Sequence, residues 1–359
     1  MKDKKSIILY KSLMHYVKDT NHLAELCSKL NKSKFLAIDT EFIREKTYWP
    51  KLCLIQVFNG EDKIIIDPLA KELDLKPFFK ILSNNEIVKI FHSGRQDIEI
   101  FYNLTKKIPK NIYDTQIAAM VCGFGDSIGY ENLVSQLLGK KIDKTSRLTN
   151  WSNRPLSKKQ INYAISDVTH LFEVYPLIMD KIINNRRESW FKEEIKILIS
   201  KKTYDLNPNE SWKRLKYRNL NKNSIGILVE LAKWREIKAQ EKDVPRGNII
   251  RDDAIYELCS AQPKNKEDLN NLRSFNRKWS LKKEFTEEIL QVIDKGKSMK
   301  KEKLPKFKPL KRLPTGISSK VSILKILLDN VSEEYGVAQK LIANKNDLQE
   351  LVLDDQADI

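Results

Sequence analysis

Apolar positions in the first two hundred residues follow two different periods. Runs of strand length cover 35–43, 52–58, 63–69 and 87–92. Helical patterns cover 20–30, 75–82, 97–104, 130–138 and 157–183. Asn59-Gly60 is a turn signal between the second and third strands, so the first three strands are predicted to form an antiparallel meander. The fourth lies between two helices and should run parallel to the first. Asp114 and Ser157 are predicted to cap the helices that follow them.

Strand signals stop near residue 205, and the remaining apolar patterns are helical. Residues 243–250 are predicted to be a loop, because Pro245 and Gly247 interrupt any helix. A basic, proline-punctuated linker follows at 295–316. The predicted organisation is an α/β domain at 1–204, an all-α domain at 205–294, the linker at 295–316, and a last helical region at 317–359.

The α/β part is predicted to be a mixed sheet with three antiparallel strands followed by α/β units. This order is typical of a ribonuclease-H-like fold, although other α/β folds share the pattern.

The composition of the chain favours an anionic binding partner. The chain carries a formal charge of +17 over 359 residues, and its pI is near 9.4, which favours nucleic acid. Lysine accumulated on solvated faces is the alternative. No run of eighteen apolar residues or signal peptide is visible, so a cytoplasmic protein is expected. The scattered cysteines and histidines form no zinc pattern.

Five residues could form a reaction centre. Asp39 and Glu41 lie two apart on a predicted strand, so both point to one face. Asp97 follows a later strand, where a helix cap is the alternative role. Tyr163 and Asp167 lie one turn apart on one face of a predicted helix, where a buried tyrosine hydrogen-bonded to a carboxylate is the alternative. Acids in such apolar elements need partners, and a cation would serve.

Together these residues resemble the three motifs of the Asp-Glu-Asp-Asp exonuclease superfamily. A tyrosine four residues before the last aspartate marks its tyrosine subclass, and Asn162 stands where the sister subclass would have histidine. FLAIDTEFIREKTYWPKLCLIQV, IFHSGRQDIEIFY, YDTQIA and NYAISDVTHL together resemble the ribonuclease D family. WREIKAQEKDVPRGNIIRDDAIYELC resembles its helicase-and-ribonuclease-D C-terminal (HRDC) domain, and the last helices look like a degenerate second copy. Gly94, where alanine is expected, is one departure.

The resemblance implies a 3′–5′ exoribonuclease that trims transfer-RNA precursors as a monomer. It implies two divalent cations roughly 3.5–4 Å apart, which the oxygen ligands suggest are Mg²⁺ or Mn²⁺. Asp39 would bridge both ions, Glu41 and Asp167 would complete one site, and Asp97 would hold the other. Tyr163 would orient the attacking water. Further residues expected to contact the 3′ nucleotide are Thr40, Phe42, Gln56, His92, Arg95 and Gln96. Core packing is the alternative role of Phe42, and bracing of the fold is that of Arg95.

Two other functions stay open on the sequence alone. One is a DNA exonuclease with the same site, because metal chemistry at a phosphate does not report the sugar. The other is a catalytically silent RNA-binding protein, although such a protein would be expected to have lost an acid or the tyrosine. The helical region is expected to follow RNA phosphates through Lys213, Arg214, Lys216 and Arg218, with a solvated helix face as the alternative.

Overall fold

The computed structural model describes residues 13–215, 224–275, 285–300, 302, 304–305 and 316–354. The chain divides into two compact units. The first, the sheet unit, comprises Met1–Ile43, Leu52–Thr203 and Arg312–Ile359. The second, the helical unit, comprises Arg44–Lys51 and Tyr204–Lys311. The last helical segment therefore belongs to the sheet unit, and a short loop from the first strands belongs to the helical one.

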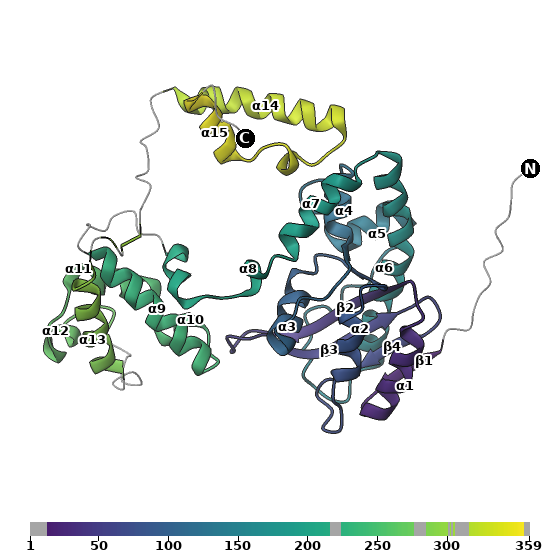
Figure 1. Ribbon diagram of the computed structural model, residues 1–359, viewed down its shortest axis with the longest axis horizontal. Helices are drawn as coiled ribbons and strands as arrows, with labels where there is room; N and C mark the ends of the chain where they lie inside the picture. The colour runs from purple at the N-terminus through teal and green to yellow at the C-terminus, as the bar shows by residue number, and fades with distance from the viewer. Residues whose placement is uncertain are drawn as a thin grey trace, which may run out of the picture. The chain divides into compact units, whose positions relative to one another are not determined.

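The sheet unit is built on one six-stranded mixed sheet (Figure 1). Its order is β1 (Met14–Val17), β4 (Lys63–Ile66), β3 (Lys51–Phe58), β2 (Phe35–Ile43), β5 (Val88–Phe91) and β6 (Ile112–Asp114). β3 pairs antiparallel with β4, while β5 runs parallel to β2. The predicted mixed sheet, and the parallel return of its fourth predicted strand, are confirmed.

Two strands were not predicted from the sequence, and both lie at the ends of the sheet. β1 has four residues and pairs parallel with β4, and β6 has three residues and pairs parallel with β5. The three residues of β6 show too few alternations to reveal a strand period.

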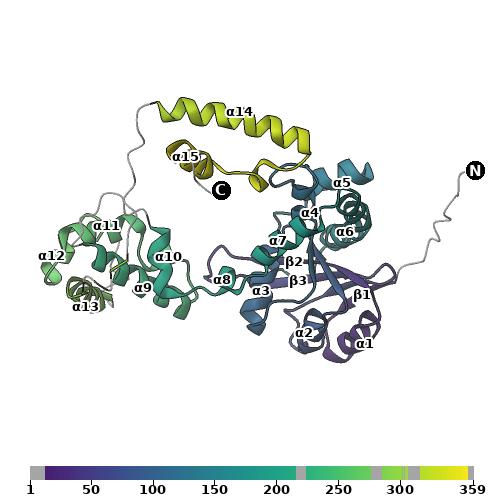
Figure 2. The same ribbon diagram turned by 45° about the horizontal axis from the view of Figure 1, so that its top comes forward.

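Helices cover both faces of the sheet (Figure 2). One face carries α1 (Thr20–Leu30) and α2 (Lys76–Ser83), and the other carries α4 (Thr115–Val121), α5 (Tyr130–Leu138) and α6 (Lys158–Asn184). The second face buries residues of β2 and β5 against α4, α5 and α6. The remaining helices before residue 205 are α3 (Arg95–Thr105), α7 (Glu188–Leu198) and α8 (Lys201–Tyr204).

The two predicted caps are confirmed. Asp114 accepts hydrogen bonds from the backbone of Gln116 and Ile117 at the start of α4. Ser157 and Gln160 form a reciprocal capping box at the start of α6. This box fixes where the long helix begins.

The helical unit packs around the central helix α9. Its elements are η1 (Pro208–Arg214), α9 (Ile225–Glu241), α10 (Arg246–Ile249), α11 (Asp252–Ala261), α12 (Lys266–Asn270) and α13 (Thr286–Lys297). A Cβ on Gly226 would meet the carbonyl oxygen of Gly296 at 2.2 Å, so α9 and α13 approach closely because both positions are glycine. Residues 243–250 are not wholly a loop as predicted, because the turn after Pro245 is the short helix α10. Lys216 and Arg218 lie outside the described residues.

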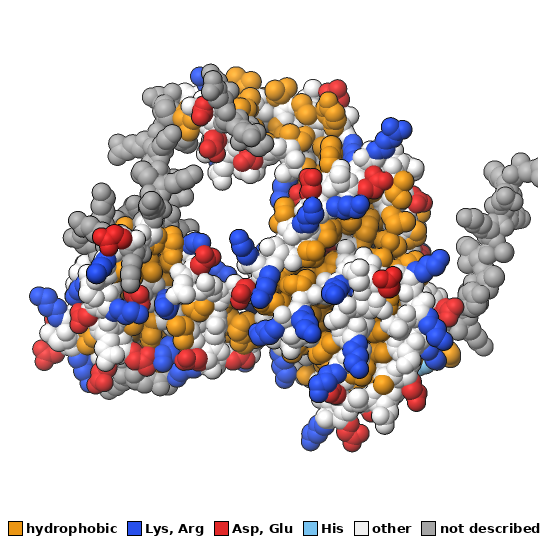
Figure 3. All heavy atoms as spheres, in the orientation of Figure 1, with side chains coloured by type: hydrophobic (Ala, Val, Ile, Leu, Met, Phe, Trp, Pro, Cys, Tyr) orange, Lys and Arg blue, Asp and Glu red, His pale blue; other side chains and the backbone are white. Residues whose placement is uncertain are grey.

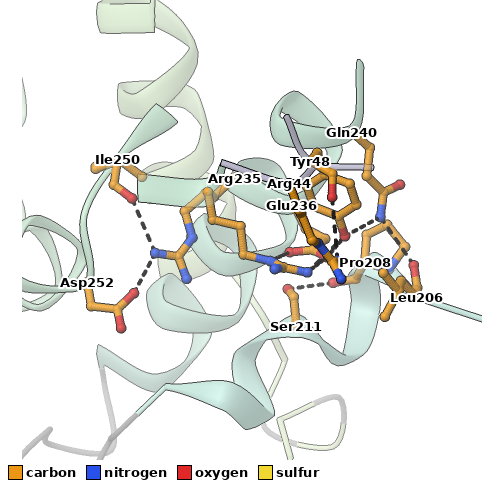
Figure 4. Close-up of polar contacts among 11 residues, drawn as sticks. Arg44, Tyr48, Leu206, Pro208, Ser211, Arg235, Glu236, Gln240, Ile250 and Asp252 are labelled. Atoms are coloured by element: carbon orange, nitrogen blue, oxygen red, sulfur yellow. Dashed lines mark hydrogen bonds and ion pairs between the residues drawn. The ribbon is translucent and has the colours of Figure 1, made fainter. Parts of the chain in front are cut away.

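The loop Arg44–Lys51 is anchored in this unit by Tyr48 (Figure 4). The buried Tyr48 hydroxyl donates a hydrogen bond to Glu236 and accepts one from Gln240. Arg246 holds the same carboxylate through two nitrogens. Burial alone would raise the pKa of Glu236, but the hydrogen bonds from Arg246 and Tyr48 outweigh it and lower that pKa. The result is a buried, ionised Glu236 with a full set of partners.

The C-terminal segment, α14 (Ile317–Tyr335), η5 (Gln339–Leu341) and α15 (Lys345–Leu353), docks on the sheet unit beside the end of α4. Arg187 donates to the carbonyl oxygens of Val121 at 2.8 Å and Gly336 at 2.7 Å. A Cβ on Gly123 would meet the Gly336 oxygen at 2.4 Å, so the contact requires glycine at position 123.

The surface shows two further features. Apolar side chains are exposed along α14, including Ile326 at 69% (Figure 3). On the same view, basic and acidic side chains are interspersed over both units rather than gathered into one basic patch. Among the described residues, no helix has the length and apolar character needed to span a membrane.

Candidate active site

Three elements of the sheet unit carry the five predicted catalytic residues. Asp39 and Glu41 lie on β2, Asp97 lies in the first turn of α3, and Tyr163 and Asp167 lie on α6. All five side chains line one cavity of about 500 Å³. Residues separated by more than one hundred positions in the sequence therefore converge at one site.

Three of the acids lie close enough to share a cation. Asp39, Glu41 and Asp167 each offer a carboxylate oxygen, and these oxygens all lie within 4.8 Å of one another. Asp167 is buried, and its Oδ1 has no hydrogen-bond partner within the described part of the chain. A buried, unpartnered carboxylate oxygen beside two further carboxylates is what a hard divalent cation requires. The residues present therefore fit a metal site.

Asp97 stands beside this group with a partner of its own. Its Oδ1 accepts a hydrogen bond from the Thr40 hydroxyl at 2.5 Å. Thr40 is the residue between Asp39 and Glu41 on β2, and it lines the same cavity. This bond ties the first turn of α3 to the strand that carries the other acids.

The cavity makes ionised carboxylates costly. Burial, with the negative charge of neighbouring acids, raises the pKa of Glu41 to about 9 and that of Asp39 well above its usual value. Burial also raises the pKa of Asp167 to about 7 and that of Asp97 to about 6. Four acids this close repel one another when ionised. A divalent cation would remove that repulsion.

Two tyrosines border the acids. Burial, followed by the charge of Asp167, raises the pKa of Tyr163 far above its usual value, so its hydroxyl stays protonated. Tyr130 donates a hydrogen bond to the backbone oxygen of Asp167, and burial raises its pKa as well. Tyr163 is therefore a hydrogen-bond donor in this cavity, and Tyr130 fixes the backbone that carries the last acid.

The residues predicted to contact the 3′ nucleotide fall into two groups. Thr40, Phe42, His92 and Gln96 line the cavity. Both ring nitrogens of His92 are within hydrogen-bond distance of protein atoms, Thr115 Oγ1 at 3.0 Å and the Ile128 oxygen at 3.2 Å. Gln56 and Arg95 do not line the cavity, and Gln56 is fully buried in β3. A nucleotide in the cavity would meet the first group.

Sequence reasoning missed several polar residues of the cavity wall, among them two cations and a second tyrosine. Tyr130, Lys144 and Arg147 all line it. Lys144 and Arg147 lie on the segment between α5 and α6, where no regular period marks a residue as inward-facing. No sequence signal singled them out.

The fold and the five converging residues define a 3′–5′ exonuclease, and comparison with known proteins agrees. The 3′–5′ exonuclease family matches residues 14–183, and the HRDC domain family matches residues 224–293. Ribonuclease D of Bartonella henselae is 42% identical over 342 residues, covering 95% of this chain and 84% of that protein. Ribonuclease D of Nitrobacter hamburgensis is 39% identical over 346 residues, covering 96% and 90%.

A solved structure gives the same result. The crystal structure of Escherichia coli RNase D, described as an exoribonuclease involved in structured RNA processing, aligns with a TM-score of 0.83 and 27% identity. The alignment covers 96% of this chain and 93% of that one. The chain therefore belongs to the ribonuclease D family of 3′–5′ exoribonucleases.

Proposed function

We propose that this chain releases 5′-mononucleotides one at a time from RNA 3′ ends by two-metal phosphodiester hydrolysis, and that transfer-RNA precursors are its substrates. The observation that carries the proposal is the convergence of the three acids of β2 and α6 within 4.8 Å, with Asp97 on the wall of the same cavity. Phosphodiester hydrolysis needs an activated water and neutralisation of charge on the leaving oxygen. Four carboxylates in one cavity suit that task only when cations are bound.

Each of the four acids would bind one or both of the two ions. Asp39 would contribute to both sites, Glu41 and Asp167 would complete one site, and Asp97, held by Thr40, would contribute to the second. Bound Mg²⁺ or Mn²⁺ would acidify the attacking water and neutralise the leaving oxygen. Two ions rather than one are supported by charge, because four ionised carboxylates exceed the charge of a single divalent cation.

Tyr163 positions the attacking water instead of removing its proton. Its raised pKa keeps the hydroxyl protonated at neutral pH, so the side chain can donate a hydrogen bond but cannot act as a base. Its place one turn before Asp167 on α6 puts it beside the metal ligands.

The proposed substrate draws on the relatives. The Escherichia coli protein is described as acting in structured RNA processing, and the present chain aligns with nearly all of it. The helical unit is proposed to hold the body of such an RNA. Among the residues suggested for this role, Lys213 forms an exposed ion pair with Glu210, and Arg214 lies in the same 3₁₀ helix. A monomer acting in the cytoplasm is part of the same proposal.

The decisive experiment uses 5′-labelled transfer-RNA precursor with Mg²⁺, with and without chelator. A ladder that shortens from the 3′ end only when Mg²⁺ is free supports the proposal. Asp39→Asn should abolish turnover while RNA binding persists. Asp180→Asn, which changes an exposed acid on α6, is the matched control and should be as active as the wild type.

A DNA exonuclease is the second candidate, because metal-assisted hydrolysis at a phosphate does not depend on the sugar. A DNA strand of the same sequence, degraded at the same rate as the RNA, would favour it. Elution at twice the monomer mass in size-exclusion chromatography with light scattering would refute the monomer.

A further inference from the structure

The segment between α5 and α6 adds two positive charges to the wall of the carboxylate cavity. Lys144 and Arg147 line the cavity together with the four acids, and both side chains are exposed. In a cavity built to hold cations, two basic side chains would compete with the metal for the carboxylates unless they serve another anion. The contacts of the segment that carries them indicate which anion they can bind.

The base of this segment is fixed to the sheet unit. Trp151 is 2% exposed and packs in a core with Cys53 and Ile65. Arg154 donates to both carboxylate oxygens of Asp67, at 2.6 Å and 2.7 Å. These contacts hold the segment in place over β3 and β4, so the positions of its outer residues are set by the core.

The outer part of the segment is solvent-exposed and faces the cavity. Leu148 is 95% exposed and lines the cavity next to Arg147. Lys144 forms an ion pair with Glu131, another residue of the cavity wall. Arg147, in contrast, makes no hydrogen bond or ion pair through its guanidinium to any residue that the structure describes.

Arg147 is nevertheless close to the acids. Arg147 lines the same cavity as Glu41 and Asp167 and is paired with neither of them. An unpaired arginine at this place can take an anion that enters with the substrate.

We infer that Arg147 donates hydrogen bonds to the phosphate of the 3′-terminal nucleotide, the one phosphate that must lie at the acids for the proposed hydrolysis, and that Lys144 adds a second positive charge beside it. The planar guanidinium presents paired donors that match two phosphate oxygens, which a lysine ammonium cannot do. The inference rests on the proposed function, because it assigns a substrate contact within that site. It makes Arg147 a catalytic residue that sequence motifs do not reveal.

Steady-state kinetics on a 5′-labelled oligoribonucleotide provide the first test. Arg147→Ala should lower kcat/KM roughly 10- to 100-fold, the range for losing a charge-assisted hydrogen bond to a charged group. Arg147→Lys should recover only part of that loss. Lys141→Ala is the matched control, because Lys141 is an exposed cation of the same segment that does not line the cavity; it should match the wild type.

Product inhibition provides a readout that a merely structural role would not move. AMP carries the phosphate that Arg147 is inferred to bind, whereas adenosine does not. In Arg147→Ala, inhibition by AMP should weaken about 10-fold while that by adenosine stays the same. Equal AMP inhibition in Arg147→Ala and wild type, or an equal loss in Lys141→Ala, would overturn the inference. A wild-type chain that fails to shorten RNA would instead refute the proposed function.

Discussion

The raised pKa values of the acids predict that the metal-free protein gains stability when one of its own metal ligands is removed. The pKa of Asp167 rises from its usual 3.8 to about 7, mainly through burial. Above pH 7 its carboxylate is ionised in both the folded and the unfolded chain. Each tenfold change in acidity is worth about 1.4 kcal/mol, so keeping this charge in the cavity costs the fold up to about 4 kcal/mol.

Asp167→Asn removes that charge and keeps the shape of the side chain. Because the acids interact, the gain in the free energy of unfolding should be on the order of 1–4 kcal/mol at pH 8 in chelator. For a folded-state pKa above the unfolded one, the cost of an acid begins near pH 4 and is complete above about pH 7. The gain should therefore shrink as pH falls from 8 to 5 and vanish near pH 4.

Scanning calorimetry is the appropriate assay, because the sheet and helical units can unfold in separate transitions. In chelator at pH 8 the sheet-unit Tm of Asp167→Asn should exceed that of wild type by several degrees. Adding Mg²⁺ should raise the wild-type Tm and leave the variant nearly unchanged. Asp180→Asn is the control for loss of an exposed carboxylate from α6. A gain that is absent at pH 8, independent of pH, or equal in the control would refute the reasoning.

Three further predictions concern the site and the loop anchor. Tyr163→Phe should lower kcat roughly 10²–10⁴-fold without changing RNA affinity; an unchanged kcat in rapid-quench assays would remove the tyrosine from the mechanism. Glu236→Gln should lower the helical-unit Tm, because it leaves Arg246 partly buried without its counter-charge, at a cost on the order of 3 kcal/mol; calorimetry showing no shift would contradict the anchor. The Mg²⁺ concentration for half-maximal activity should rise as pH falls below 7, since Asp167 then binds a proton; a flat dependence between pH 5.5 and 8 would contradict the raised pKa.

Regular elements with many periods were predictable from the sequence. β2 and α6 carry three of the four acids, and the apolar pattern alone predicts the ranges of both elements and the Ser157 cap. The parallel pairing of β2 with β5 followed from the helix between them. In a long periodic segment the apolar positions show which face is buried. This is why the acids on β2 and α6 could be assigned to a face from the sequence.

Contacts between distant segments were not predictable. The anchoring of Tyr48 by Glu236 joins residues 188 positions apart and depends on side chains that carry no pattern. The three-residue strand β6 offers too few residues for a period. The docking of the C-terminal segment through Gly123 and Arg187 depends on a close backbone approach, which a sequence alone does not show.

The residues of the site, too, fall into predictable and unpredictable ones. Motif spacing and family resemblance predicted the four acids and Tyr163, and all five line one cavity. Arg147 and Lys144 lie in an irregular segment whose position is set by Trp151 and Arg154, so their direction could be read only from the structure. Gln56 and Arg95 belong to segments that resemble the family, yet they lie outside the cavity wall.

The central claim is that the four acids form a divalent-metal site, and anomalous diffraction from crystals soaked in Mn²⁺ tests it most directly. The account predicts two Mn²⁺ peaks, both in contact with Asp39, one also with Glu41 and Asp167, and the other on the side of Asp97. Asp39→Asn crystals treated identically should lose at least one peak. Crystals that diffract well and show no Mn²⁺ at these carboxylates would contradict the account.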